Sequence, residues 1–256
     1  MRIARFSYRD KQFWGVISGN HVQLLKEQPY SGIRKSNIQI SLSKIKFLVP
    51  AVPQKIILVG LNYKDHAKEL NMPVPKEPVI FIKPVTSLIA HQEEIIYPAQ
   101  VKRLDYEAEL ALVIKKKAKN ISPQKAVSYI LGFTCLNDVT ARDIQKKDRQ
   151  WTRAKSFDTF CPVGPYLETD INPKNLFVKS YLNGKIKQDS NTSNFIFPVN
   201  YLVSFISSIM TLYPGDIIST GTPFGVGSMR PGDLIEIEIQ GIGRLVNRVK
   251  KIRRTA

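Results

Sequence analysis

Residues 105–114 read Asp105-Tyr106-Glu107-Ala108-Glu109-Leu110-Ala111-Leu112-Val113-Ile114, an apolar run that begins with acidic residues. An apolar run of this length predicts a β-strand over residues 107–114. Side chains alternate between the two faces of a strand, so Glu107 and Glu109 should point the same way, roughly 6–7 Å apart. Two carboxylates on one buried face repel each other unless a positive charge lies between them. The stretch therefore indicates a site for a hard divalent cation such as Mg²⁺.

A third carboxylate, Asp138, follows the next predicted strand at residues 132–136 and offers another oxygen ligand to the same ion. Both observations also have plain structural explanations. A Glu-x-Glu pair is common on the solvent-facing side of an edge strand, and Asp138 precedes a predicted helix that it could cap. The spacing alone leaves these alternatives open.

Composition limits the class of protein. The 256 residues suffice for one large domain with a small appendage. No stretch of about 18 apolar residues predicts a transmembrane span, and the N-terminal segment lacks the apolar region of a signal peptide. Cys135 and Cys161 have no metal-binding spacing, so we expect two buried thiols in a reducing cytoplasm.

The net charge of +17 raises the question of a nucleic-acid or membrane partner. The lysines are scattered, as at Lys115–Lys117 and Lys146–Lys147, and they form no helical stripe. No motif with interleaved aromatic residues suggests RNA binding. We therefore expect no nucleic-acid and no membrane partner, and we interpret the charge as steering anionic substrates.

The hydrophobic pattern predicts a mainly β, mixed α+β fold rather than alternating βαβ units. Residues 1–50 are expected to form a small β-rich domain, and residues 51–256 the catalytic domain, with a boundary at Pro50 and Pro53. Two Pro-Gly-Asp turns and Asn183-Gly184 mark strand connections. The predicted strands cover residues 2–6, 12–17, 21–25, 55–59, 79–82, 107–114, 132–136, 163–167, 176–182, 185–188, 216–220, 234–239 and 244–250. The predicted helices cover residues 62–70, 123–130, 140–147 and 199–210.

Other polar residues near these elements are candidates for catalysis or binding. His66 and Glu69 are three apart on one helix face, so the carboxylate can orient the ring as a general base; an exposed ion pair is the alternative. Asn62 is a candidate cap of this helix. Lys83 and Lys155 lie in semi-apolar runs, where each needs a partner, either a substrate anion or a site carboxylate such as Glu109.

Several segments resemble the signatures of the fumarylacetoacetate hydrolase family, in order and at fitting spacing. The resemblance covers residues 55–249, most of the chain, and the short bacterial members fit best. The segments are Val59-Gly60-Leu61-Asn62-Tyr63-Lys64-Asp65-His66-Ala67-Lys68-Glu69, Phe81-Ile82-Lys83-Pro84, the stretch 105–110, Asn137-Asp138-Val139-Thr140-Ala141-Arg142-Asp143, the stretch 151–162 and the stretch 214–227.

The resemblance implies a central β-sandwich roll with a flanking small domain, and a homodimer formed through the catalytic domain. It implies that Glu107, Glu109 and Asp138 bind Mg²⁺ or Mn²⁺. It further implies that His66 and Glu69 lie on a lid and activate water, with Lys155 as a further catalytic residue. Lys83, Arg142, Gln145 and Thr222 are the implied substrate ligands, although Arg142 and Gln145 also suit a solvated helix face.

The family's chemistry implies a metal-dependent hydrolase that cleaves a carbon–carbon bond in a small anionic substrate. That substrate would be a β-diketo or 2-oxo acid of the acylpyruvate or fumarylpyruvate type, and oxaloacetate decarboxylation is compatible with the same site. The ion would act as a Lewis acid and stabilise an enolate. The alternatives are isomerisation or decarboxylation of 2-hydroxyhepta-2,4-diene-1,7-dioate in aromatic degradation, and a non-catalytic ligand-binding member.

Overall fold

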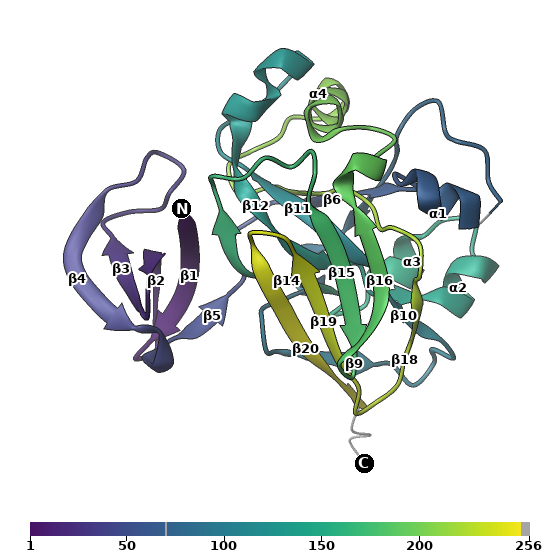
Figure 1. The fold of residues 1–256 in the computed structure, drawn as a ribbon, viewed down its shortest axis with the longest axis horizontal. Coiled ribbons are helices and arrows are strands. Elements are labelled where there is room, and N and C mark those ends of the chain that lie inside the picture. Colours follow the sequence, from purple (N-terminus) through teal and green to yellow (C-terminus); the bar gives the residue numbers. More distant parts are fainter. Residues whose placement is uncertain (70, 252–256) are drawn as a thin grey trace.

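The computed structural model describes residues 1–69 and 71–251. These residues form a strand-rich fold with mixed sheets, and the predicted mainly β class is confirmed (Figure 1). Leu70 of the predicted helix 62–70 and residues 252–256 of the predicted catalytic domain lie outside the described part.

The largest sheet of the described residues has twelve strands. Its main path runs β4-β3-β2-β1-β14-β12-β11-β17-β6-β7, with β5 paired to β1 and β8 paired to β14. The strands are β1 (Arg2–Tyr8), β2 (Lys11–Ser18), β3 (His21–Leu25), β4 (Lys35–Ser41), β5 (Lys46–Leu48), β6 (Ile56–Gly60), β7 (Val79–Lys83), β8 (Leu88–Ile89), β11 (Ala108–Ile114), β12 (Ile130–Asn137), β14 (Cys161–Glu168) and β17 (Ile217–Ser219).

Two smaller sheets complete the described strands. A five-stranded sheet has the order β16-β15-β19-β20-β9, and a three-stranded sheet has the order β13-β10-β18. Their strands are β9 (Glu94–Tyr97), β10 (Leu104–Tyr106), β13 (Thr140–Ala141), β15 (Phe177–Leu182), β16 (Lys185–Asn191), β18 (Gly227–Met229), β19 (Leu234–Ile239) and β20 (Gly243–Lys251).

The helices are short apart from α4. They are α1 (Lys64–Glu69), α2 (Arg142–Lys147), α3 (Thr152–Lys155) and α4 (Val199–Ile209), with 3₁₀ turns η1 (Leu42–Lys44), η2 (Val85–Ser87), η3 (Pro123–Tyr129) and η4 (Thr192–Asn194). The predicted helix 123–130 is therefore a 3₁₀ segment instead. In the described part of the chain, no helix has both the length and the apolar character needed to cross a bilayer.

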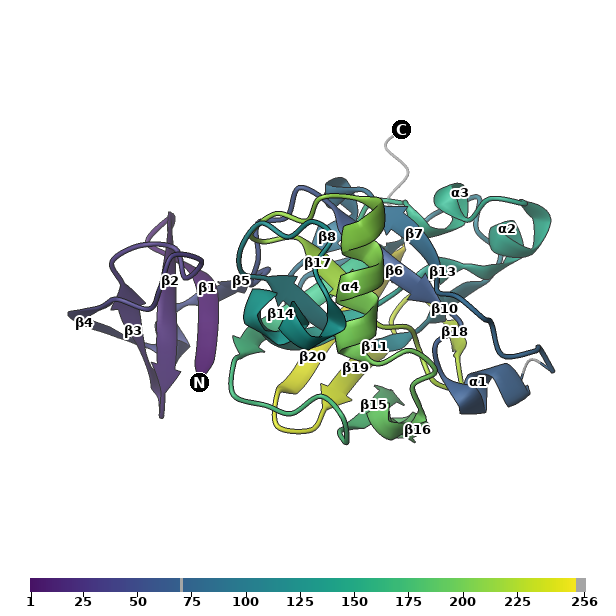
Figure 2. The same ribbon diagram turned by 90° about the horizontal axis from the view of Figure 1, so that it is seen from above.

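The first four strands form a separate N-terminal lobe, with β5 leading back to the main body (Figures 1 and 2). It joins the main body where β1 pairs with β14, with Ile3 opposite Leu167. Strand β4 lies in a polar stretch with no predicted strand. It is the edge of the sheet and buries only Ile40, so its sequence lacks the apolar alternation that predicts a strand. Helices α1, α2 and α3 lie at the opposite end of the molecule in both views.

Strand β11 is the centre of the core, and every one of its residues is buried. Its alternate side chains Leu110 and Leu112 pack in a cluster with the five-stranded sheet. Ala111 and Val113 pack on the other face with Ile217 of the neighbouring β17 and with Ile56 of β6, the next strand of the sheet. The predicted strand 107–114 begins one residue later, because the chain passes from β10 of the small sheet into β11 at Glu107. This junction places the acidic residues where two sheets meet.

The turn signals of the sequence behave as predicted. Gly215 and Gly232 have φ values of 91° and 100°, which suit the third position of a type II turn. Asn183 and Gly184 both have positive φ and connect β15 to β16 as a tight hairpin. Cys135 and Cys161 are buried and unpaired, so the expectation of buried thiols is confirmed.

Candidate metal and substrate site

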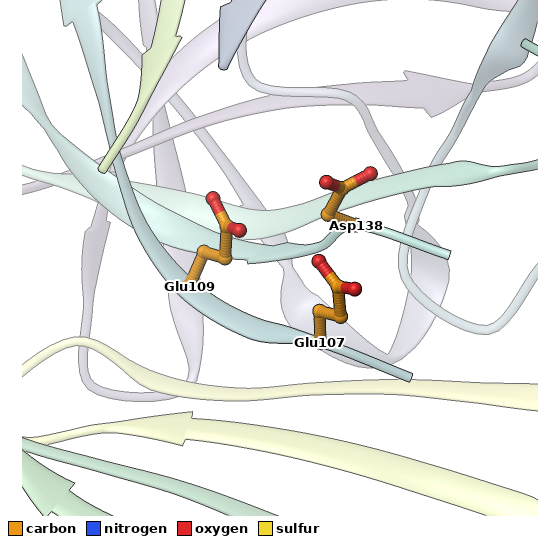
Figure 3. A group of neighbouring side chains, drawn as sticks. All are labelled: Glu107, Glu109 and Asp138. Atoms are coloured by element: carbon orange, nitrogen blue, oxygen red, sulfur yellow. The ribbon is translucent and has the colours of Figure 1, made fainter. Parts of the chain in front are cut away.

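Three buried carboxylates converge where β10, β11 and β12 meet. Glu107 lies at the β10–β11 junction, Glu109 is on β11, and Asp138 directly follows β12. The antiparallel pairing of Ala108 with Asn137 brings these segments together. One oxygen from each carboxylate lies within 4.8 Å of the others, and Figure 3 shows the three groups facing one another. We call this set the carboxylate trio.

Two buried lysines neutralise part of the trio. Lys155 Nζ donates to Asp138 Oδ2 at 2.6 Å and to Glu107 Oε2 at 2.9 Å. Lys83 Nζ lies 2.5 Å from Asp138 Oδ1 and donates to the backbone carbonyls of Val139 and Phe160. Asp138 is therefore paired with a buried ammonium at each of its two oxygens.

Arg142 is also committed to carboxylates of the protein. Its Nε donates to Asp105 Oδ2 at 2.8 Å, and its Nη2 donates to Glu107. Its Nη1 donates to the Gln145 side-chain oxygen. To act as the implied substrate ligand, Arg142 would have to share or give up hydrogen bonds that it already makes within the protein. Its clearest structural effect is to hold Glu107 in place.

The surroundings of Glu107 and Glu109 shift the pKa values of the two side chains in opposite directions. Burial would raise the pKa of Glu107, but Lys155 and Arg142 together hold that pKa well below its usual value. Burial, with the nearby charges of Asp138 and Glu107, raises the pKa of Glu109 well above its usual value. The carboxylate of Glu109 accepts hydrogen bonds from Ser219 Oγ and from the backbone N–H of Gly221, which fix its position. Glu109 thus lacks a cationic partner of its own among the described residues.

These residues fit a divalent cation. Carboxylate oxygens are the ligands that Mg²⁺ and Mn²⁺ prefer. A positive charge between the three groups would remove the cost of ionising Glu109 beside two other carboxylates. The trio could therefore hold such an ion.

His66 lies on α1 and lines the same cavity as the trio. Its Nδ1 is 2.8 Å from Glu69 Oε2, as the spacing predicted, and the other oxygen of Glu69 accepts a hydrogen bond from Gly225 N–H. A second carboxylate, Asp65, accepts hydrogen bonds from Ser190 and Asn194 and ties the same helix to the β16–η4 segment.

The suggested helix cap at Asn62 is wrong. The side chain of Asn62 is fully buried and bonds the backbone of Phe197 and Thr220 instead. It therefore joins the segment before α1 to the loops that follow η4 and β17. A single sequence could not show this, because both partners lie more than 130 residues away along the chain.

The cavity has a volume of about 310 Å³. Most predicted site residues line it, and they are His66, Glu107, Glu109, Asp138, Arg142, Gln145, Lys155 and Thr222. Glu69 and Lys83 do not line it: Glu69 contacts His66, and Lys83 pairs with Asp138 and has an exposed fraction of 0%. Lys83 thus makes the bond to a site carboxylate that was the alternative, and its contact with substrate stays a prediction.

Sequence reasoning missed three other residues of this region. Lys146 and Trp151 line the cavity, and Gln188 donates to Thr222 Oγ1 at 2.8 Å. Gln188 also accepts a hydrogen bond from Ala108 N–H, so it connects β16 to the start of β11. Neither Lys146 nor Gln188 has a local sequence signal, whereas Trp151 lies in a segment that resembles a family signature.

Comparison with known proteins agrees with this site. Residues 55–250 match the fumarylacetoacetate (FAA) hydrolase C-terminal family, and residues 1–50 match the Rv2993c-like N-terminal family. The chain therefore belongs to the fumarylacetoacetate hydrolase family, whose members are enzymes. It is 43% identical over 220 residues to the mitochondrial oxaloacetate tautomerase FAHD2B of Homo sapiens, covering 81% of this chain and 70% of the human protein.

Solved structures extend the comparison to nearly the whole chain. The 5-carboxymethyl-2-hydroxymuconate delta-isomerase of Mycobacterium smegmatis superposes with a TM-score of 0.94 at 38% identity, covering 98% of this chain and 100% of that one. The 2-hydroxyhepta-2,4-diene-1,7-dioate isomerase of Mycobacterium marinum gives a TM-score of 0.92 at 40% identity, with 98% of each chain covered. Both similar proteins are named as isomerases.

Proposed function

We propose that this protein is a divalent-metal-dependent enzyme that catalyses proton transfer at the carbon beside the keto group of a 2-oxo dicarboxylic acid. Keto–enol tautomerisation of oxaloacetate and isomerisation of a longer 2-oxo diacid both belong to this class. The observation that carries the proposal is the placement of His66 in the cavity of the carboxylate trio. The names of the similar tautomerase and isomerases support proton transfer over the hydrolysis that we expected first.

The residues of the chain divide the chemistry between them. Glu107, Glu109 and Asp138 would hold Mg²⁺ or Mn²⁺, which supplies Lewis-acid polarisation of the substrate's oxygens. His66 Nδ1 is held by Glu69, and Nε2 has no partner among the described residues, so Nε2 is the atom that takes and returns the proton. The Glu69 carboxylate stabilises the ring while it carries the extra proton.

Lys155 supplies a second positive charge. Lys155 is 2% exposed, and its ammonium lies against two members of the trio, where the negative charge of an enolate would develop. Preorganised charge in a site shielded from water stabilises such a species without reorganisation. This role needs no contact with water and suits proton transfer and carbon–carbon cleavage alike.

Hydrolysis of an acylpyruvate is the second candidate function. The same observation favours it, because a histidine oriented by a carboxylate can activate water as well as remove a carbon-bound proton. The two functions differ in whether water is consumed. Analysis of the reaction products therefore distinguishes the two functions, whereas the identity of the site residues does not.

The test compares both reactions in protein that has been treated with EDTA and then supplied with Mg²⁺ or Mn²⁺. We expect metal-dependent ketonisation of enol-oxaloacetate, followed by its ultraviolet absorbance, at a rate well above that of metal ion in buffer. Acetopyruvate hydrolysis is measured in parallel. D138N is the matched control, since it is nearly isosteric and removes one charge from the trio. Absence of acceleration with every 2-oxo acid in the metal-loaded wild type would contradict the proposal.

A further inference from the structure

The cations that line the cavity are not equivalent. Arg142 donates to Asp105, Glu107 and Gln145, and Lys155 donates to Glu107 and Asp138. The third, Lys146, forms no ion pair and no side-chain hydrogen bond with any described residue. Its side chain is exposed, so its ammonium is free for a ligand that enters the cavity.

Lys146 also has a suitable neighbour. Gln145 precedes it on α2, lines the same cavity, and accepts from Arg142 through its side-chain oxygen. The amide nitrogen of Gln145 therefore remains as a donor without a partner in the described part of the chain. An amide donor and an ammonium that line the same cavity are suitable groups for a carboxylate.

The position of this pair relative to the trio decides which carboxylate it would take. The trio and Lys155 are nearly fully buried and form the inner end of the cavity, whereas Lys146 is exposed and forms part of its rim. A 2-oxo acid that reacts beside the trio keeps its 2-oxo end inside. The far end of the substrate then faces α2.

We propose that Lys146 binds the distal carboxylate of a 2-oxo dicarboxylic acid and selects dicarboxylates over monocarboxylates. This inference rests on the proposed function, because it assumes that the 2-oxo end lies beside the trio. It makes Lys146 a specificity-determining residue rather than a catalytic one. Its contribution should be modest and salt-sensitive, because an exposed ion pair is screened by solvent and ions.

The test measures binding by calorimetry to the Mg²⁺-loaded protein, so that it does not depend on turnover. The two probes are 2-oxoglutarate and 2-oxopentanoate, which have the same chain length and differ in the distal carboxylate. K146M keeps the length of the side chain and removes its charge. We expect K146M to weaken 2-oxoglutarate binding about three- to tenfold and to leave 2-oxopentanoate binding unchanged.

Two further variants make the test specific. K147M removes the adjacent charge on α2 from a residue that does not line the cavity, and it should leave both affinities unchanged. K146R keeps the charge and should retain the preference for 2-oxoglutarate. If K146M weakens the binding of both acids equally, or if K147M weakens 2-oxoglutarate binding as much as K146M does, the inference is overturned.

The inference and the proposed function can fail separately. A wild-type protein that binds both acids equally well overturns the role of Lys146 but leaves proton transfer on 2-oxo acids standing. If the wild type ketonises oxaloacetate and K146M keeps the full preference for the dicarboxylate, the role of Lys146 is likewise overturned and the proposed function still stands. Absence of binding for both acids overturns the inference, and the ketonisation assay then decides the proposed function independently.

Discussion

Glu69 accepts a hydrogen bond from the backbone N–H of Gly225 at 3.1 Å, while its other carboxylate oxygen lies 2.8 Å from His66 Nδ1. The carbonyl of the same glycine accepts a hydrogen bond from Tyr106, the residue before Glu107. The position of His66 is thus connected through Glu69 and Gly225 to Tyr106 at the end of β10, directly before Glu107 of the carboxylate trio. The proposed catalytic base and the proposed metal ligands are therefore connected through the loop that contains Gly225.

Substitutions of Glu69 separate its two contacts. E69Q can still accept from Gly225 but loses the charge that stabilises a protonated His66, whereas E69A loses both. We expect metal-dependent activity to fall about tenfold in E69Q and further in E69A. Steady-state kinetics with oxaloacetate checks the order of the two variants. Wild-type activity in E69A would show that the contact with His66 has no catalytic role.

His66 divides the reactions of which this site is capable. H66A should reduce oxaloacetate ketonisation and acylpyruvate hydrolysis by about 10²–10⁴-fold, the usual contribution of a general base. Metal-assisted decarboxylation of oxaloacetate needs no such base and should change much less. The three rates are measured on one preparation with its metal content determined. Comparable losses in all three, at unchanged metal affinity, would contradict this division.

Gly60 is required for the packing of Trp151 against strand β6. A Cβ atom at residue 60 would lie 2.7 Å and 2.9 Å from two atoms of the Trp151 ring, closer than van der Waals contact permits. The ring would have to move, and with it α3, whose Lys155 N–H bonds the Trp151 carbonyl at 3.0 Å. G60A should therefore lose about 1–3 kcal/mol of stability and also lose activity.

Thermal unfolding of G60A and of the double variant G60A/W151F checks this explanation. Phenylalanine lacks the ring atoms that collide, so the double variant should recover part of the lost stability. If G60A unfolds at the wild-type temperature, the predicted collision does not occur.

His91 should make the stability of the fold depend on pH. Burial lowers the pKa of His91, and its Nδ1 accepts a hydrogen bond from Val246 N–H, which only the neutral ring can do. Because the pKa is lower in the folded state, unfolding takes up a proton at mildly acidic pH. The contribution of His91 is therefore complete above about pH 6.5 and is lost as the pH falls toward its folded pKa.

Melting temperatures at about pH 7.5 and about pH 5.5 check this sign. H91Q should be less stable than the wild type near neutrality, and the difference should narrow in acid. H21Q is the control, since His21 is exposed and its loss should leave the wild-type pH dependence intact. If the melting temperatures of the wild type and H91Q differ by the same amount at both pH values, the prediction is contradicted.

Much of the fold could be predicted because its signals are local. Strands such as β11, β12 and β19 have continuous or alternating apolar residues, and the Pro-Gly and Asn-Gly turns have fixed backbone requirements. The short strands β8, β10, β13 and β18 have two or three residues each and exist only because a partner lies beside them. Their sequences contain no periodicity that could be detected.

The site could be predicted in part for the same reason. The carboxylate trio and the His66–Glu69 pair combine local spacing with a family resemblance. The sequence could not decide between the two roles of Lys83, because its partners Asp138, Val139 and Phe160 become neighbours only through folding. Gln188 was missed because it reaches the loop residue Thr222 from β16 of the five-stranded sheet, and its own sequence context is that of an ordinary polar strand.

The central claim is that the carboxylate trio binds a divalent ion, and calorimetric titration of EDTA-treated protein with Mn²⁺ tests it most directly. The wild type should bind about one ion per chain, and E107Q, E109Q and D138N should each bind at least about tenfold more weakly. Circular dichroism should show that the variants remain folded. Failure of the wild type to bind an ion, or binding by the folded variants as tight as that of the wild type, would contradict the account.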